Sequence, residues 1–125
     1  MNVIEKISVV MCTYNGEKYI RQQLDSILKQ TYPIYEIIIN DDISTDGTVD
    51  IIKEYMIRYD NIHLFVNSKR LGVHPNFMAA LVKASGDYIA ISDQDDIWEL
   101  TKIEKQMACI KGYALCFSLS RMSCT

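Results

Sequence analysis

Acidic residues gather at two places in this sequence of 125 residues. Asp93 and Asp95 are separated by one residue, and Asp41 and Asp42 are adjacent. Two carboxylates two residues apart in an extended segment point to the same side of the chain. Carboxylate oxygens are ligands of hard cations such as Mg²⁺, which complete their shells with water and substrate phosphates. The pair formed by Asp93 and Asp95 therefore predicts a Mg²⁺ or Mn²⁺ site that also holds a phosphate-bearing substrate.

Both acidic pairs also have a structural interpretation. Asp93 and Asp95 can belong to a solvated loop in which Asp96 caps a helix. Asp41 and Asp42 can face a helix N-terminus, where the helix dipole favours negative charge. They can equally accept hydrogen bonds from a base or a ribose, as an acidic residue at a strand end does in dinucleotide sites. The sequence leaves these alternatives open.

Four further residues are candidates for contact with a nucleotide. Thr13, Tyr14 and Asn15 follow an apolar run and precede Gly16. They form either a simple turn or a loop whose amides and small side chains hold part of the ligand. Arg70 is either a solvated cation or a ligand of a diphosphate, which suits the planar fork of its donors.

The elements that must position these residues alternate along the chain. Short apolar runs typical of strands buried on both faces occupy residues 7–12, 37–39, 62–66 and 88–92. Between them apolar residues recur at helical spacing, as at Ile20, Leu24 and Ile27. A helix is expected at 101–110 and a fifth strand at 114–118.

This alternation predicts a three-layer α/β/α domain built on a mostly parallel, Rossmann-like sheet with right-handed crossovers. Ligands of such sheets bind beyond the carboxyl ends of the strands. The first, second and fourth predicted strands each end at polar or acidic candidates. Three separate loops are therefore expected to bring these side chains to one edge of the sheet.

Composition and motifs exclude several classes of protein. The 49% hydrophobic and 23% charged residues are near the globular average, so disorder is excluded. The net charge of -3 without a basic stripe argues against a nucleic-acid partner. No G-x-G-x-x-G follows the first strand, which argues against a dehydrogenase. A phosphorylated receiver domain would carry its acidic pair after the first strand, whereas here the pair follows the second.

The cysteines and the apolar runs indicate in which cellular compartment the protein is expected. Cys12, Cys109, Cys116 and Cys124 lack metal-site spacing, so reduced thiols are expected. No signal peptide and no run of roughly 18 apolar residues is present. We therefore expect a cytoplasmic domain, and peripheral association with the inner face of the membrane stays open.

Five segments, taken in order, resemble the family 2 glycosyltransferases, which are inverting enzymes with the GT-A fold. Each segment is weak alone, but their order and separations are specific, and the resemblance covers residues 5–118. The segments are Ile7–Val10 with Thr13–Asn15, Leu24–Leu28 with Gln30–Tyr32, Asp41–Asp42 with Ser44–Thr48, Leu71–Gly72 with Asn76, and Gly86–Ile89 before Asp93–Asp96. The last segment is similar to that of bacterial polysaccharide enzymes, including rhamnosyltransferases.

The resemblance implies transfer of a sugar from a nucleotide-diphosphate sugar to a glycan acceptor during cell-surface polysaccharide biosynthesis. It implies that Asp42 binds the base with Asp41 beside it, and that the loop at 13–15 lines the nucleotide site. It also implies that Asp95 binds a Mn²⁺ or Mg²⁺ ion through the diphosphate, and that Asp93 contacts the metal or the ribose. The alternative is a catalytically inactive fragment that only binds nucleotide.

The sequence departs from the family at two places. Ile43 stands where the family usually has glycine, so a positive φ there would place a β-branched residue under strain. We expect residues 1–118 to form a nucleotide-sugar-binding half-domain, and residues 119–125 do not continue the family pattern. The resemblance places the general base and the acceptor-binding part beyond residue 125, so no catalytic residue is expected here. A truncated sheet would expose an apolar edge, which favours self-association.

Overall fold

A computed structural model describes residues 4–93 and 96–112 of the chain. Strands and helices alternate through this part, as the apolar pattern predicts. The elements are β1 (Ile7–Thr13), α1 (Ile20–Leu28), β2 (Glu36–Asp41), α2 (Thr48–Arg58), β3 (Ile62–Val66), α3 (Val73–Leu81), β4 (Tyr88–Ser92) and α4 (Lys102–Gly112). The fifth strand predicted at 114–118 lies outside the described residues.

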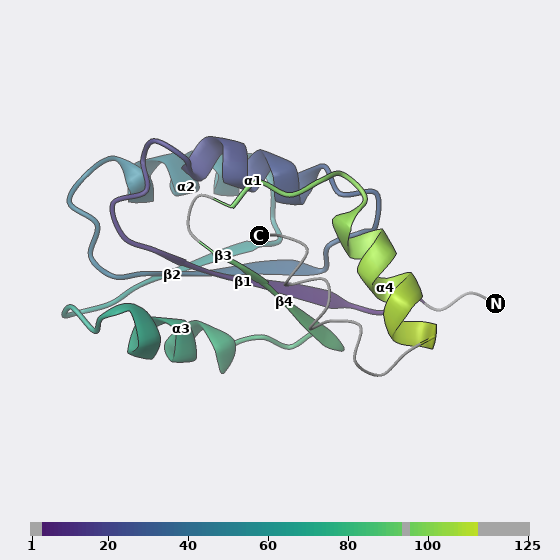
Figure 1. Ribbon diagram of the computed structural model, residues 1–125. Helices are drawn as coiled ribbons and strands as arrows, with labels where there is room; N and C mark the ends of the chain where they lie inside the picture. Colours follow the sequence, from purple (N-terminus) through teal and green to yellow (C-terminus); the bar gives the residue numbers. More distant parts are fainter. Residues whose placement is uncertain (1–3, 94–95, 113–125) are drawn as a thin grey trace.

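The described strands form one parallel sheet in the order β3-β2-β1-β4. Helices α1 and α2 cover one face and α3 covers the other, so the predicted three-layer α/β/α class is confirmed (Figure 1). The chain runs outward from β1 through β2 to β3 and then returns to place β4 on the other side of β1. Such a reversal of strand order is the topological switch point at which open α/β sheets bind ligands.

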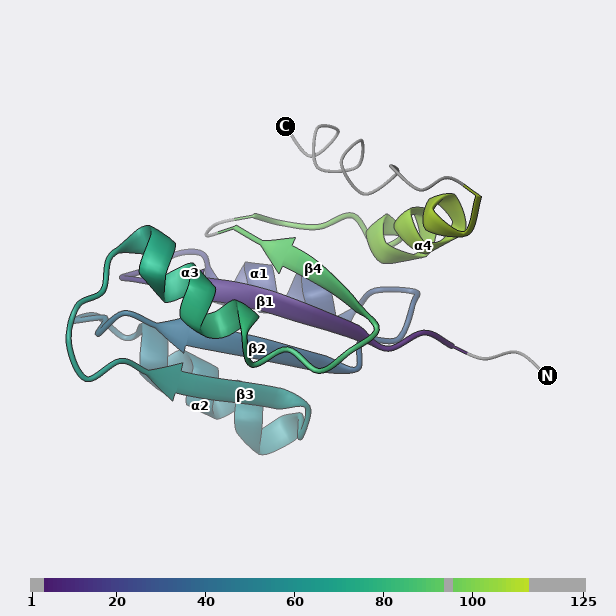
Figure 2. The ribbon, with the colours of Figure 1, turned by 90° about the horizontal axis from the view of Figure 1, so that it is seen from below.

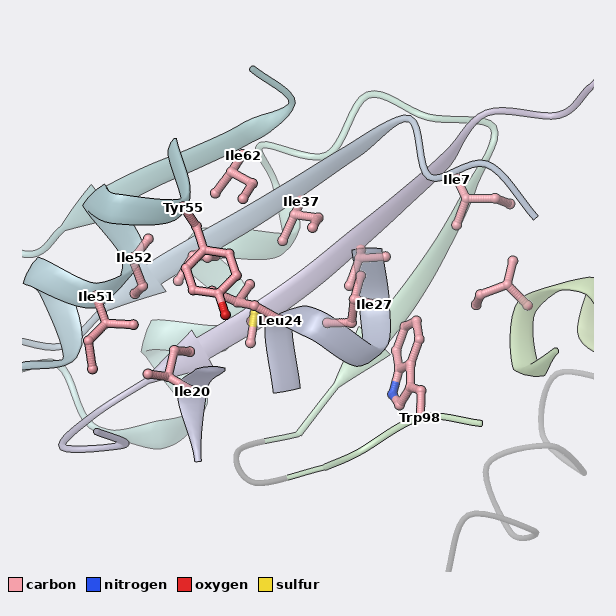
Figure 3. Close-up of a cluster of buried hydrophobic side chains, with 14 of the residues drawn as sticks. Ile7, Ile20, Leu24, Ile27, Ile37, Ile51, Ile52, Tyr55, Ile62 and Trp98 are labelled. Atoms are coloured by element: carbon pink, nitrogen blue, oxygen red, sulfur yellow. The ribbon is translucent and has the colours of Figure 1, made fainter. Parts of the chain in front are cut away.

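Side chains alternate between the two faces of the sheet and fill two hydrophobic clusters. Val9 and Met11 of β1 face α1 and α2, whereas Val10 faces α3. The larger cluster is shown in Figure 3, where Leu24 and Ile27 of α1 lie over the strands. Burial of each such aliphatic side chain contributes roughly 1.5–3 kcal/mol, so this face of α1 holds the helix on the sheet.

Helix α4 lies beside the β4 edge of the sheet, as Figure 2 shows. Its Ile103 and Met107 join the same cluster as α1, together with Trp98 from the preceding segment. The Trp98 amide donates to Ser26 Oγ at 3.0 Å. The segment that follows β4 is thus tied to α1, which fixes where the chain leaves the end of that strand.

Two further observations bear on the sequence expectations. Within residues 4–93 and 96–112, no helix is long and apolar enough to cross a bilayer. Cys12 is a free thiol, but Cys109 is disulfide-bonded, so the expectation of reduced thiols is wrong for Cys109. Spacing along the chain does not show which cysteines approach one another in the fold, and that approach decides whether a disulfide can form.

Candidate functional site

A cavity of about 420 Å³ opens at the switch point, beyond the carboxyl ends of β1, β2 and β4. Five of the seven predicted nucleotide-binding residues line it. They are Thr13, Tyr14, Asp42, Arg70 and Asp93. The loops that follow β1, β2 and β4 therefore meet at one edge of the sheet, as the sequence predicts.

Asp42 is held by hydrogen bonds on both carboxylate oxygens. Oδ1 accepts from the Leu71 amide at 2.8 Å and from Asn67 Nδ2 at 3.0 Å. Oδ2 accepts from the Gly72 amide and from Arg70 Nε, both at 3.0 Å. Only 3% of the side chain is exposed. Asp42 thus fastens the loop between β3 and α3, including Gly72 at the N-cap of α3, to the end of β2.

These donors set the charge state of Asp42. Burial by itself raises the pKa of the carboxyl. The amides of Leu71 and Gly72, the Asn67 side chain and the Arg70 guanidinium together outweigh burial and hold the pKa well below its usual range. The carboxylate is therefore ionised at neutral pH, and its negative charge fixes the position of Arg70.

Arg70 joins Asp42 to Tyr14. Its Nε donates to Asp42, and its Cζ lies 3.7 Å from the centroid of the Tyr14 ring. A guanidinium that close to an aromatic ring is favoured by the charge distribution of the ring. The side chain nevertheless remains 53% exposed. A planar cation is thus held at the wall of the cavity by a carboxylate on its edge and a ring on its face.

Amide side chains from β2, from the loop after β3 and from α3 form a hydrogen-bonded network that supports Asp42. Asn40 Nδ2 donates to Asn67 Oδ1 at 2.8 Å and to Asn76 Oδ1 at 2.7 Å. Asn76 Nδ2 returns a hydrogen bond to the Asn40 carbonyl at 3.0 Å. Lys83 Nζ donates to Asn40 Oδ1 at 2.7 Å. Because Asn67 also donates to Asp42, the network connects β2, the loop after β3 and α3 into one support for the carboxylate.

Asp41 and Asn15 do not line the cavity. The buried Asp41 accepts hydrogen bonds from the Thr13 and Ser44 hydroxyls and from the Ser44 amide, at 2.6, 2.6 and 2.8 Å. Asn15 Oδ1 accepts from the Thr45 amide at 2.7 Å. Both side chains fasten the loop after β1 to the loop after β2, so their contribution to the site is to hold its frame.

The backbone at Ile43 has a φ of 59°, which is the left-handed region. A β-branched residue is disfavoured there by roughly 1–2 kcal/mol, because its Cβ approaches the following carbonyl oxygen. The sequence expectation that this position needs the freedom of glycine agrees with the observed backbone. The strained residue lies between the buried carboxylate of Asp42 and the hydroxyl of Ser44.

The opposite end of the cavity is built differently. Asp93 follows β4 and is exposed, and its carboxylate accepts no hydrogen bond from the described part of the chain. Its carbonyl accepts from Gln23 Nε2 at 2.6 Å, and the same Nε2 donates to Ser92 Oγ at 2.9 Å. Gln23 is fully buried on α1. A helix side chain thus fixes the backbone of Asp93 and leaves the carboxylate available.

Asp95, the other predicted metal ligand, lies outside the described residues. Among the residues that are described, no group of three or more His, Cys, Asp or Glu side chains could hold a metal ion. Asp96 does not cap a helix, because α4 begins only at Lys102. Its amide instead donates to the Asp93 carbonyl at 3.1 Å.

Sheet order sets the separation of the two acidic ends. Asp42 follows β2 and Asp93 follows β4, and β1 lies between these strands. Two interstrand spacings correspond to roughly 10 Å. Cys12 of β1 lies between them, and burial, followed by the charges of Asp42 and Asp93, raises the pKa of its thiol to about 11. The thiol is therefore neutral at physiological pH.

Several lining residues were not predicted from the sequence. They are Cys12, Val73, His74, Asn76, Phe77, Ile91 and Ser92. One of them, His74, lies on the first turn of α3. The spacing of Val73, Asn76 and Phe77 is that of one helix face, so the apolar period of α3 was the available signal.

The family model described as glycosyl transferase family 2 matches residues 8–124. The chain belongs to this family. The match runs past residue 118, the predicted end of the half-domain, and that boundary stays a prediction because residues 113–125 lie outside the described part.

One relative in sequence and one solved structure illustrate the similarity of this family 2 chain to known proteins. The dTDP-rhamnosyl transferase RfbG of Shigella flexneri is 40% identical over 114 residues, which are 86% of this chain and 39% of RfbG. S. aureus TarS 1-349, solved with UDP-GlcNAc, superposes with a TM-score of 0.80 at 31% identity over 87% of this chain and 32% of TarS 1-349.

A mannosyltransferase from Pyrobaculum calidifontis, PcManGT, solved with GDP-Man and Mn²⁺, superposes with a TM-score of 0.76 at 26% identity. The superposition covers 84% of this chain and 32% of that one. The chain has the GT-A fold of these enzymes, and the family to which it belongs is one of transferases. It spans less than half the length of the curated relatives it matches.

Proposed function

We propose that this chain forms the donor site of a glycosyltransferase that moves a sugar from a nucleotide-diphosphate sugar to a glycan acceptor. The observation that carries the proposal is the cavity at the switch point, where Asp42, Arg70 and Asp93 converge from three loops. Relatives named for dTDP-rhamnosyl transfer and for complexes with UDP-GlcNAc and GDP-Man support a nucleotide-sugar donor. A relative named for teichuronic acid biosynthesis supports a role in polysaccharide formation.

A divalent cation, Mn²⁺ or Mg²⁺, belongs to this proposal. The exposed carboxylate of Asp93 at the cavity fits a hard cation, and Asp95 two residues on would supply the second oxygen ligand. When bound, the cation would neutralise the negative charge that develops on the leaving diphosphate. PcManGT was solved in complex with Mn²⁺, which supports the choice of metal.

Different residues of the chain then serve different parts of the ligand. Thr13 and Tyr14 line the nucleoside part of the cavity, and Asp42 fixes the loop that carries Arg70. Gln23 holds the Asp93 backbone in place for the diphosphate end. An inverting transfer also needs a base to take the proton of the acceptor hydroxyl, and we assign no residue of 1–125 to that step.

The rival function is binding of a nucleotide without catalysis. We expect little transferase activity from this chain. Robust turnover by residues 1–125 would contradict the proposal that the chain carries only the donor site.

We also propose a cytoplasmic location with peripheral membrane contact, which cell fractionation tests. The exposed Ile89 and Ile91 of β4 favour self-association, which light scattering tests.

The deciding experiment is calorimetric titration with UDP, dTDP and GDP, each with and without Mn²⁺. We expect Mn²⁺ to tighten the binding of at least one of them, and Asp95→Ala or Asp93→Ala to abolish the Mn²⁺ effect. Asp87→Ala is the control, because Asp87 lies at the opposite end of β4 and its carboxylate accepts from the Lys6 amide. Absence of binding by every nucleotide would overturn the donor-site proposal.

A further inference from the structure

Lys83 lies just beyond the C-terminal end of α3, apart from the residues that line the cavity. Its Nζ donates to Asn40 Oδ1 at 2.7 Å and lies 4.2 Å from the centroid of the Phe65 ring. An ammonium group between an amide oxygen and an aromatic face is held in place, because both contacts favour the cation. The proposed function gives this lysine no role, although the amide that it contacts belongs to the network that supports Asp42.

The charge of Lys83 fixes the direction of the hydrogen bonds that lead to Asp42. An ammonium group donates and cannot accept, so the Asn40 atom that it contacts must be the amide oxygen. Asn40 Nδ2 therefore faces the other way, and it donates to Asn67 Oδ1 at 2.8 Å and to Asn76 Oδ1 at 2.7 Å. Asn67 then has only its own Nδ2 to offer to Asp42 Oδ1, at 3.0 Å. Two amide side chains thus connect the donor at Lys83 to the carboxylate.

The two ends of this chain of amides require the same orientation. Lys83 can only donate and the ionised Asp42 can only accept, so a reversed amide between them would set oxygen against oxygen. Asn40 is fully buried, so water cannot replace a partner that it loses. Hydrogen bonds in such a chain polarise and strengthen one another. The cation at one end therefore strengthens the donation from Asn67 to Asp42 at the other.

We propose that Lys83 is a positioning residue of the nucleotide cavity and that it acts through Asn40 and Asn67. The loop that begins at Asn67 continues to Leu71 and Gly72, whose amides donate to the same carboxylate as Asn67 does, at 2.8 and 3.0 Å. A weaker bond from Asn67 loosens this loop and with it one wall of the cavity. The inference rests on the proposed donor site and adds a residue outside the cavity that controls its affinity.

The test is calorimetric titration of UDP, dTDP and GDP, with Mn²⁺, into wild type and three variants. Lys83→Arg keeps a cation that can only donate, Lys83→Met removes the donor, and Lys83→Glu presents acceptors to Asn40 Oδ1. We expect Lys83→Arg to bind nucleotide about as well as wild type. We expect Lys83→Met to bind about threefold to tenfold more weakly, which corresponds to one hydrogen bond, and Lys83→Glu more weakly still. Lys53→Met is the control, because Lys53 is exposed on α2, on the other face of the sheet.

The side-chain amide of Asn67 gives a readout that distinguishes positioning from a loss of packing. Donation to a carboxylate moves amide protons downfield in NMR spectra, so Lys83→Met is expected to move the Asn67 signal upfield. The Asn61 side chain is the internal control, because it donates to the Ile34 carbonyl at the opposite end of β3. Partial unfolding lowers the intensity of the folded-state signals but does not move them.

Salt distinguishes the amide network from a direct attraction between Lys83 and the diphosphate. The reach of exposed charges falls from ~10 Å at about 0.1 M salt to ~3 Å at about 1 M. We expect the affinity ratio of wild type to Lys83→Met to persist at the higher concentration. A ratio that falls to one there would indicate long-range attraction and overturn the proposal.

The remaining outcomes also decide the matter. Equal affinity of wild type and Lys83→Met, or an Asn67 signal that stays in place, would refute the positioning role and leave the donor site standing. Equal losses in Lys83→Arg and Lys83→Met would show that packing of the lysine matters and its donor character does not. If no nucleotide binds the wild-type chain, the donor site and the positioning role fail together, and the Asn67 signal alone shows whether Lys83 polarises the amides.

Discussion

The two acidic ends of the cavity contain the same chemical group in opposite surroundings. Asp42 is buried beneath the loop between β3 and α3 and accepts four hydrogen bonds, whereas Asp93 is exposed and its carboxylate is free of donors from the described residues. The first carboxylate is a structural member of the fold. The second is available to a ligand. Identical residues at the ends of β2 and β4 therefore have different roles, and the difference lies in how many donors the fold brings to each.

The largest expected effect is a difference in stability between substitutions at the two acidic ends of the cavity. Asp42→Ala leaves two buried amides, an amide side chain and Arg70 without their acceptor, so we expect the free energy of unfolding to fall by about 3 kcal/mol. Asp93→Ala removes an exposed group, and a change within about 0.5 kcal/mol is expected. Urea denaturation measures both. Equal destabilisation by the two substitutions would contradict the comparison.

The pH dependence sharpens the same contrast. Burial tends to raise the pKa of Asp42, but its donors hold the pKa below the usual range in the folded chain. Its stabilisation is therefore complete above the unfolded value of about 3.9 and is lost as the pH falls toward the folded pKa. We expect unfolding free energies measured between about pH 5 and pH 2 to fall less steeply in Asp42→Asn than in wild type.

Some acid dependence is expected to remain in Asp42→Asn. The pKa values of Glu36 and Asp46 are also lowered: burial raises each, and hydrogen bonds, chiefly from Ser8 and Ser85 to Glu36 and from Thr48 to Asp46, outweigh it. The relevant quantity is thus the difference in slope between the two proteins. An unchanged slope would mean that the pKa of Asp42 is the same in the folded and the unfolded chain.

A smaller effect is expected at the Asp93 end. Gln23→Met keeps the volume of the side chain but removes the donor to Ser92 Oγ and to the Asp93 carbonyl. We expect a loss of about 1–2 kcal/mol in unfolding free energy and a weaker effect of Mn²⁺ on nucleotide affinity. Gln22→Met is the matched control, because Gln22 is exposed on the same helix. A normal Mn²⁺ effect in Gln23→Met would show that Asp93 needs no support from α1.

The smallest effect concerns the strained residue beside Asp42. Ile43→Gly relieves a left-handed conformation that costs roughly 1–2 kcal/mol, and part of this gain is offset by the greater freedom of glycine in the unfolded chain. We expect a stabilisation of up to about 1 kcal/mol by urea denaturation and tighter nucleotide binding by calorimetry. Unchanged or weaker affinity would show that the strain does not reach the site.

Much of the fold follows from local pattern in the sequence. Apolar runs such as Ile37–Ile39 are long enough to specify buried strands, and the period of Ile20, Leu24 and Ile27 specifies the buried face of α1. Because the strands are parallel, the position of Asp42 and Asp93 at strand ends was enough to predict that they share one edge. The same period does not set the bounds of α1, which the structure places at Ile20–Leu28.

The role of each side chain at that edge was decided only by tertiary structure. The donors to Asp42 come from residues 25 to 30 positions later in the chain, and Gln23 reaches the carbonyl of Asp93 across 70 positions. A hydrogen bond depends on ångström-scale placement, which strand order and loop packing set and which local periodicity does not contain. The sequence thus determined that the ends of β1, β2 and β4 meet at one edge of the sheet. The packing of α3 and its preceding loop determined that the acceptor sites of Asp42 are filled within the fold while Arg70 and Asp93 remain available.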